Sequence, residues 1–148
     1  MARPPAGGGG RQPKALIGPP VDGKPTFSFR YIDRGYDGLW GWVKTHEHAS
    51  EVLTFLCEMS KDSWNEIGSH RTGGERGSYR KHHSQPIETL CPEARQRLAE
   101  LELDEIFEDD IFRFRLGNKK RLWGFRVDGV FYVLWWDPDH KVYPTEPS

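Results

Sequence analysis

The residues best suited to chemistry lie in the last third of the chain, between positions 110 and 143. Arginines alternate with apolar residues in the segments DIFRFR and RLWGFR, and the segment HKVY follows them. An arginine fork can hold two phosphate oxygens, and histidine, lysine and tyrosine can transfer protons. Cleavage of RNA by its own 2′-hydroxyl group needs a proton acceptor, a proton donor and positive charge at the phosphate. The candidate catalytic residues are Arg113, Arg115, His140, Lys141 and Tyr143.

A second basic segment could help to bind the same substrate. Residues 69–86 are polar and rich in glycine, and we interpret them as a long loop of the kind that is usually functional or mobile. Strand parity places Arg121 and Arg126 on opposite faces, so one of the two should join the candidate catalytic arginines. Aromatic side chains could stack on unpaired bases. The candidate substrate-binding residues are Arg80, Lys81, His82, His83, Arg121 and Arg126.

Each of these signals also has a purely structural interpretation. Alternating arginines on an antiparallel strand are typical of a solvated outer face. The histidines at 82 and 83 can be ordinary loop residues, and Tyr143 can be a packing residue that anchors the chain end. Lys119 and Lys120 are assigned to solubilising a turn, and the Trp135-Trp136 pair to the core.

The sequence predicts no metal site and no cofactor. His46 and His48 are two positions apart and would face different directions on a helix, so they do not suit one metal ion. HExxH, paired CxxC, GxSxG, P-loop and dinucleotide-binding motifs are all missing from the chain. Any catalysis is therefore expected to be metal-independent.

Composition predicts one domain with a tail. The chain has 148 residues and a formal net charge of −1, so binding to nucleic acid would need a local basic patch. Residues 1–24 are rich in glycine and proline and are predicted to be disordered, and residues 25–148 form the domain. The sequence has no apolar run that could span a membrane and no signal-peptide core. Cys57 and Cys91 do not belong to a paired-cysteine motif such as CxxC, which indicates a reduced, cytoplasmic protein.

Helix signals occupy the middle of the chain. Thr45 can cap a helix whose apolar positions recur in steps of three and four. Ser63 to Glu66 is a capping box before a short second helix. Pro92 suits the first turn of a third helix, which should run to about Glu102. The predicted buried positions of the first helix are Ala49, Val52, Leu53, Leu56 and Met59.

The strands are predicted on both sides of these helices. Alternation from Thr26 to Tyr31 indicates a first strand. Residues 110–116, 121–127 and 130–136 should form an antiparallel meander, with a type I′ turn at Asp128-Gly129. The last of these strands is apolar on both faces, as a central strand would be. Together these elements predict an α+β domain: a strand, two to three helices against one face, then the meander.

The segment RLWGFRVDGVFYVLWWDPDHKVY resembles the last two strands and the terminal turn of the RelE/ParE toxin superfamily, and the order of elements over residues 26–143 is similar. In those toxins a basic, aromatic strand precedes an apolar strand and a basic or histidine residue near the C-terminus. The resemblance implies a toxin neutralised by a small antitoxin, which we expect to be a helix-turn-helix protein. The RelE branch implies a ribosome-associated mRNA endoribonuclease. The ParE branch, or a non-catalytic interaction module, implies binding to a protein target such as gyrase.

Overall fold

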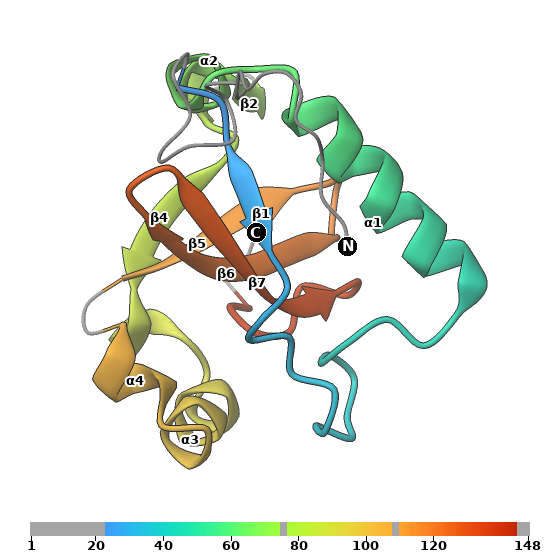
Figure 1. Cartoon of the computed structure of the whole chain (residues 1–148), viewed down its shortest axis with the longest axis vertical. Coiled ribbons are helices and arrows are strands. Elements are labelled where there is room, and N and C mark those ends of the chain that lie inside the picture. Colours follow the sequence, from blue (N-terminus) through green and yellow to red (C-terminus); the bar gives the residue numbers. More distant parts are fainter. Residues whose placement is uncertain (1–22, 75–76, 108–109, 145–148) are drawn as a thin grey trace, which may run out of the picture.

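The computed structural model describes residues 23–74, 77–107 and 110–144 (Figure 1). Its helices and strands make an α+β fold, which confirms the predicted fold class. The predicted tail, residues 1–24, lies outside the described part except for its last two residues. The helices are α1 (His46–Met59), α2 (Trp64–Ser69), the 3-10 helix η3 (Ile87–Thr89), α3 (Pro92–Glu100) and α4 (Leu103–Ile106), and the strands are β1 (Thr26–Ser28), β2 (Arg71–Gly74), β3 (Gly77–Arg80), β4 (His83–Pro86), β5 (Asp110–Arg115), β6 (Arg121–Val127) and β7 (Val130–Asp137).

Local signals placed the helix starts correctly. The Thr45 hydroxyl accepts a hydrogen bond from the His48 backbone N at 3.0 Å, and the capping box of Ser63 and Glu66 is complete. These contacts satisfy backbone N–H groups that the first turn of a helix leaves without partners. The buried face of α1 is narrower than predicted, because Leu53 is 62% exposed and Ala49 also faces solvent.

The predicted loop over residues 69–86 is wrong. Strands β2 and β3 form a separate hairpin, and β4 joins the main sheet by antiparallel pairing with β5. These strands are short and polar, so they lack the apolar alternation that identifies a strand from sequence. Their stability comes from pairing with neighbours, which is a tertiary property.

The main sheet has the order β1-β7-β6-β5-β4. Its antiparallel β5-β6-β7 part confirms the predicted meander, and β7 is internal as its apolar character indicated. Strand β1 is shorter than predicted and pairs in parallel with β7, so the sheet is mixed. Within the predicted type I′ turn only Asp128 has positive φ, at 56°, so the turn is not of that type.

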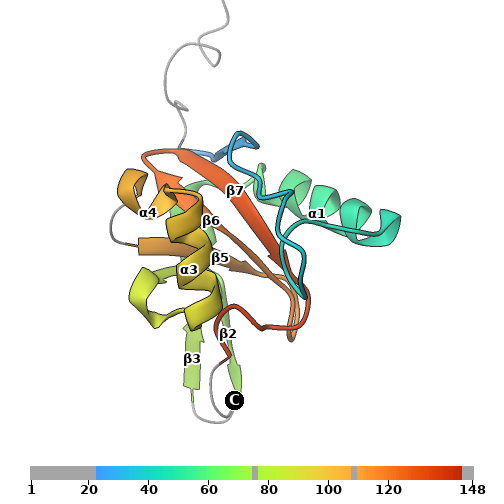
Figure 2. The same ribbon diagram turned by 90° about the horizontal axis from the view of Figure 1, so that it is seen from below.

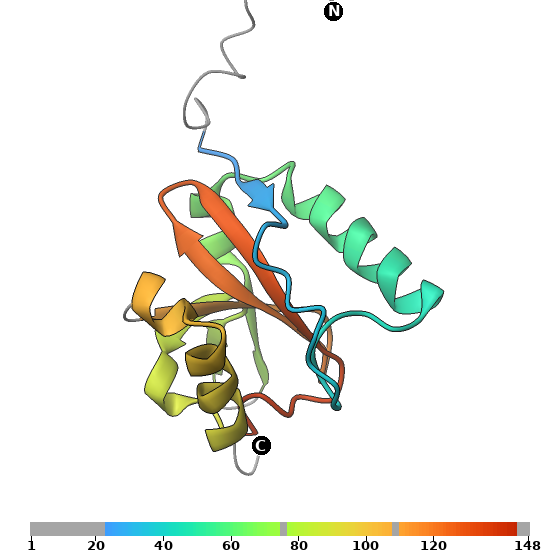
Figure 3. The same cartoon turned by 60° about the horizontal axis from the view of Figure 1, so that its bottom comes forward.

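Helices cover both faces of the sheet, which corrects the prediction that they lie on one face. Helices α1 and α2 pack on a core that includes Phe112, Phe114 and Leu122. Helices α3 and α4 pack on the opposite face, against a core that includes Ile111 and Trp123. Figures 2 and 3 show the sheet between these two groups of helices. Among the described residues, no helix is long and apolar enough to cross a membrane.

A bulge in β7 changes which of its side chains face each side of the sheet. Trp123 pairs with Trp135 and Gly124 with Val133, so Leu134 is an extra residue on β7. As a result Leu134 and Trp135 both pack in the core under α3. A Cβ on Gly124 would lie 2.1 Å from the Tyr132 carbonyl oxygen, so no side chain fits there.

The first prediction follows from this close approach. Gly124→Ala should lower the free energy of unfolding by about 1–3 kcal/mol, because the strand must move away from β7. Chemical denaturation followed by tryptophan fluorescence measures the change. Gly68→Ala is the control, since a Cβ at Gly68 meets no atom within 4 Å. Equal stability of the Gly124 variant and the wild type would contradict the close approach of β6 and β7 at Gly124.

Candidate functional site

Three arginines lie together on the α3 side of the sheet. Arg115 is directly opposite Arg121 in the β5-β6 ladder, and Arg113 is opposite Trp123. Residues opposite one another share a face, so Arg121 is the one of the two arginines on β6 that joins the pair on β5. We call Arg113, Arg115 and Arg121 the arginine cluster.

The arginine cluster concentrates positive charge, and the buried carboxyl group of Asp137, opposite Arg121 in the β6-β7 ladder, compensates part of it. Within the described part of the chain, no carboxylate oxygen lies within 4.0 Å of a guanidinium nitrogen of the three arginines. Burial and then the charge of Arg115 lower the pKa of Arg113 to about 10. Burial and the charges of Arg113 and Arg115 also lower the pKa of Arg121 to about 10, against the opposing charge of Asp137. The buried Nε atoms of Arg113 and Arg121 have no hydrogen-bond partner among the described residues. Unpaired guanidinium groups that repel one another favour binding of an anion.

The turn between β5 and β6 holds two of these arginines in place. Arg115 Nε donates to the Gly117 carbonyl at 2.9 Å. Arg121 Nη1 donates to the carbonyls of Asn118 at 3.2 Å and Lys120 at 3.1 Å. Arg121 is only 5% exposed, so its main contacts are structural. Arg113 and Arg115 are half-buried and are therefore better placed to contact a ligand.

His83 orients Arg113 from the neighbouring strand β4. Arg113 Nη2 lies 2.7 Å from His83 Nε2, and an arginine can only donate, so Nε2 accepts this hydrogen bond. The proton of His83 is then on Nδ1, which donates to the Ser84 carbonyl at 3.0 Å. Burial lowers the pKa of His83, and the charge of Arg113 adds to this effect. Both ring nitrogens are thus engaged, which makes His83 a positioning residue for Arg113.

Asp137 forms the turn that carries the C-terminal candidates. Its two carboxylate oxygens accept hydrogen bonds from the backbone N of Lys141 and of Val142, both at 2.9 Å. His140, inside this turn, has a φ of 59°. Asp137 was not among the candidate residues that the sequence indicated. The signal was available, because aspartate commonly accepts hydrogen bonds from backbone N–H groups a few residues later in a turn.

His140 is brought within electrostatic reach of the arginine cluster. Burial and then the charges of Arg121, Arg113 and Arg115 lower the pKa of His140 to about 4. The imidazole is therefore neutral at pH 7 and can accept a proton. The ring of Tyr143 lies 6.5 Å from the ring of His140. Tyr143 also interacts electrostatically with Arg113, so Arg113, Arg115, His140 and Tyr143 belong to one region, and their catalytic roles stay predictions.

The remaining candidates are placed differently. Lys141 is exposed, and its backbone N is its only hydrogen-bonding group with a described partner. His82 packs in the other core against Phe55 and Phe114 and is 2% exposed. Arg126 stacks on the Trp64 ring, with 4.1 Å from Cζ to the ring centroid.

The other two candidates lie at the end of β3 and in the connection to β4. Arg80 is exposed at the end of β3, while the Lys81 carbonyl accepts a hydrogen bond from Arg113 Nη1 at 3.4 Å. Lys81 therefore contributes its backbone to the arginine cluster. Arg80, His82, His83 and Arg126 line a separate pocket beside α2.

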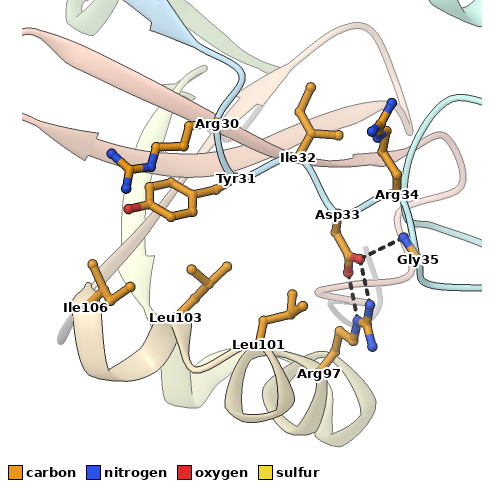
Figure 4. Close-up of a pocket in the computed structure, with 10 residues that line it drawn as sticks. All are labelled: Arg30, Tyr31, Ile32, Asp33, Arg34, Gly35, Arg97, Leu101, Leu103 and Ile106. Carbon is orange, nitrogen blue, oxygen red and sulfur yellow. Dashed lines mark hydrogen bonds and ion pairs between the residues drawn. The ribbon is translucent and has the colours of Figure 1, made fainter.

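A further pocket, of about 370 Å³, lies between α3, α4 and the segment after β1 (Figure 4). Its buried carboxylate, Asp33, accepts two hydrogen bonds from Arg97 at 2.8 Å each and one from Trp135 Nε1 at 2.9 Å. The Gly35 backbone N donates to it as well. These partners satisfy the hydrogen-bonding capacity of the Asp33 carboxylate. Its ion pair with Arg97 therefore holds the segment after β1 against α3, and the carboxylate needs no ligand.

No group of three or more His, Cys, Asp or Glu side chains is arranged to hold a metal ion in the described part of the chain. The side chains of the arginine cluster and its neighbours are suited to anion binding and proton transfer. Comparison of the chain with protein-family models, curated proteins and solved structures gives no match. The RelE/ParE resemblance and the toxin function accordingly stay predictions.

Proposed function

We propose that the protein is the toxin of a toxin–antitoxin pair in the cytoplasm. It acts as a metal-independent endoribonuclease that cleaves mRNA in association with the ribosome. The single observation that carries the proposal is the arginine cluster beside His140. Three guanidinium groups that form no ion pair within 4.0 Å among the described residues lie within electrostatic reach of a neutral imidazole. Structural arginines usually have a partner carboxylate, whereas a phosphate site needs unpaired donors.

The reaction we propose is attack of the RNA 2′-hydroxyl on the adjacent phosphorus. The 2′-O–P bond forms, the P–O5′ bond breaks, and a cyclic phosphate and a 5′-hydroxyl group result. Arg113 and Arg115 hold the phosphate oxygens and stabilise the charge that grows in the transition state. His140 accepts the 2′ proton, and Tyr143 donates a proton to the leaving oxygen.

The low pKa of His140 is consistent with this role. The three arginines and burial disfavour the imidazolium form in the free protein. A bound phosphate adds negative charge, which offsets the repulsion from the arginines and raises the pKa of His140. His140 therefore becomes a stronger base when the substrate is in place.

A second candidate function is a non-catalytic interaction module that binds a protein target such as gyrase. One observation favours it: the Arg121 guanidinium donates to carbonyls of the Gly117–Lys120 turn, as a structural arginine would. In that case the basic surface would bind acidic side chains of a partner protein and no RNA would be cleaved.

The test is induced expression of the chain with and without the neighbouring gene, which should encode the antitoxin. We expect growth arrest and cut transcripts without that gene and normal growth with it. The purified protein should cut a labelled RNA in the presence of a metal chelator and leave a 2′,3′-cyclic phosphate. An RNA with a single 2′-deoxy residue at the cleaved position should stay intact there. Growth arrest with intact transcripts, free or ribosome-bound, would favour the interaction module.

A further inference from the structure

A pocket of about 460 Å³ lies beside α2, at the β4 edge of the main sheet. We call it the α2 pocket. Its walls come from α2, the β2-β3 hairpin, β4, β5 and β6. Three of its lining residues are arginines, Arg71, Arg80 and Arg126, and the described lining contains no carboxylate. The α2 pocket is therefore strongly basic, although the whole chain has a formal net charge of −1.

Two of these arginines are placed against each other. Arg71 and Arg80 are directly opposite in the β2-β3 ladder, and both are exposed. Like charges in this position repel and destabilise the pair of strands. Neither arginine forms an ion pair with a described residue. An anion between the two guanidinium groups would turn this repulsion into attraction.

The opposite wall supplies further groups for an anion. Arg126 lies over the Trp64 ring, and its Nε donates to the Asp128 carbonyl at 3.4 Å, so these contacts hold the guanidinium at the pocket wall. His82 is 2% exposed, and its Nδ1 accepts a hydrogen bond from the Arg115 backbone N at 3.0 Å. The His82 proton is therefore on Nε2, which is buried and has no partner among the described residues.

We propose that the α2 pocket binds a phosphate-bearing nucleotide of the same single-stranded RNA whose scissile phosphate lies at the arginine cluster. His83 joins the two regions, because it lines the α2 pocket and its Nε2 accepts a hydrogen bond from Arg113. Strand β4 is the edge of the sheet, so an RNA chain can pass over it from one region to the other. The pocket volume falls in the range of sites for small organic ligands, which exceeds the needs of a bare phosphate ion. This inference rests on the proposed function for its substrate class.

The test is fluorescence anisotropy with a labelled single-stranded RNA of about ten nucleotides. Its 2′-hydroxyl groups are methylated, so that binding is measured without cleavage. The full chain is compared with the double variant Arg71→Ala/Arg80→Ala, with Arg113→Ala and with the control Arg34→Ala, which removes an exposed arginine at a different pocket. Thermal melting confirms that each variant is folded.

We expect the double variant to weaken binding about tenfold or more, since charge-assisted hydrogen bonds are lost. The slope of log K against log salt should fall by about 0.7 for each phosphate contact removed. Arg34→Ala should bind as the wild type does. Unchanged binding by the double variant, together with weaker binding by Arg113→Ala, would overturn the α2 pocket and leave the proposed function standing. Unchanged binding by the double variant and by Arg113→Ala would contradict both the α2-pocket proposal and the proposed function.

Competition separates RNA from other anions. Inorganic phosphate, a mononucleotide and polyglutamate are each added to the complex of the wild type with the labelled RNA. We expect none of them to compete as well as an unlabelled RNA of the same length. Equal competition by phosphate or the mononucleotide would make the α2 pocket a site for a small phosphate compound. Equal competition by polyglutamate would indicate an acidic protein partner, and either outcome would overturn the RNA assignment.

Discussion

Replacing Arg113 by alanine should lower the rate of RNA cleavage by about a hundredfold to a thousandfold, which is typical when one group that stabilises transition-state charge is lost. Arg113 is half-buried beside His83, and the Nε of Arg113 is free of described partners. The substitution removes both the charge and the fork that fits two phosphate oxygens. The measurement is single-turnover cleavage of a labelled RNA by purified protein, with circular dichroism as the folding control.

Two further variants make this prediction specific. Arg113→Lys retains the charge without the fork, so we expect a cleavage rate between those of the alanine variant and the wild type. Lys119→Ala removes an exposed cation from the turn after β5 and should leave the rate unchanged. His140→Ala should cause a loss similar to that of Arg113→Ala. If folded Arg113→Ala and His140→Ala both cut RNA at the wild-type rate, the site assignment is wrong.

Replacing Asp33 by alanine should lower the free energy of unfolding by about 3–5 kcal/mol, the range for breaking a buried ion pair. Asp33 is 3% exposed and accepts hydrogen bonds from Arg97, Trp135 and Gly35. Its removal leaves the buried Trp135 N–H without its acceptor and the Arg97 guanidinium with only the exposed Glu100. Urea denaturation measures the loss. Glu100→Ala is the matched control, because it removes the exposed partner of the same arginine and should cost about 0–1 kcal/mol.

The contribution of Asp33 should also depend on pH. Burial raises the pKa of Asp33, but hydrogen bonds from Arg97 and Trp135 and the charge of Arg97 outweigh it, so the pKa lies below the ordinary value of 3.8. The folded state thus prefers the ionised carboxylate. The stabilisation is complete above the unfolded-state pKa and is lost as the pH falls through the lower pKa of the folded state. The stability difference between wild type and Asp33→Ala should therefore shrink below about pH 4. A difference that stays constant as the pH falls well below about 4 would show that the ion pair does not carry the effect.

The sequence by itself determined the features that depend on a few neighbouring residues. Thr45, the Ser63–Glu66 capping box and Pro92 marked the starts of helices, because each acts on backbone groups within one turn. Alternation predicted the strands β5 and β6 and placed Arg113 and Arg115 on one face. Side-chain direction alternates along a strand whatever lies beyond it, so this prediction needed no tertiary knowledge.

Tertiary structure alone decided how distant segments meet. Strand β4 was hidden in a polar stretch, since it is defined by pairing with β5 rather than by its own composition. Its register brings His83 to Arg113, and the fold joins Asp33 to Arg97 across 64 positions. Pairing of this kind depends on the three-dimensional arrangement of strands and helices, which local propensity does not encode. For that reason residue types indicated the chemistry of the arginine cluster, while its geometry and the basic α2 pocket emerged only from the folded chain.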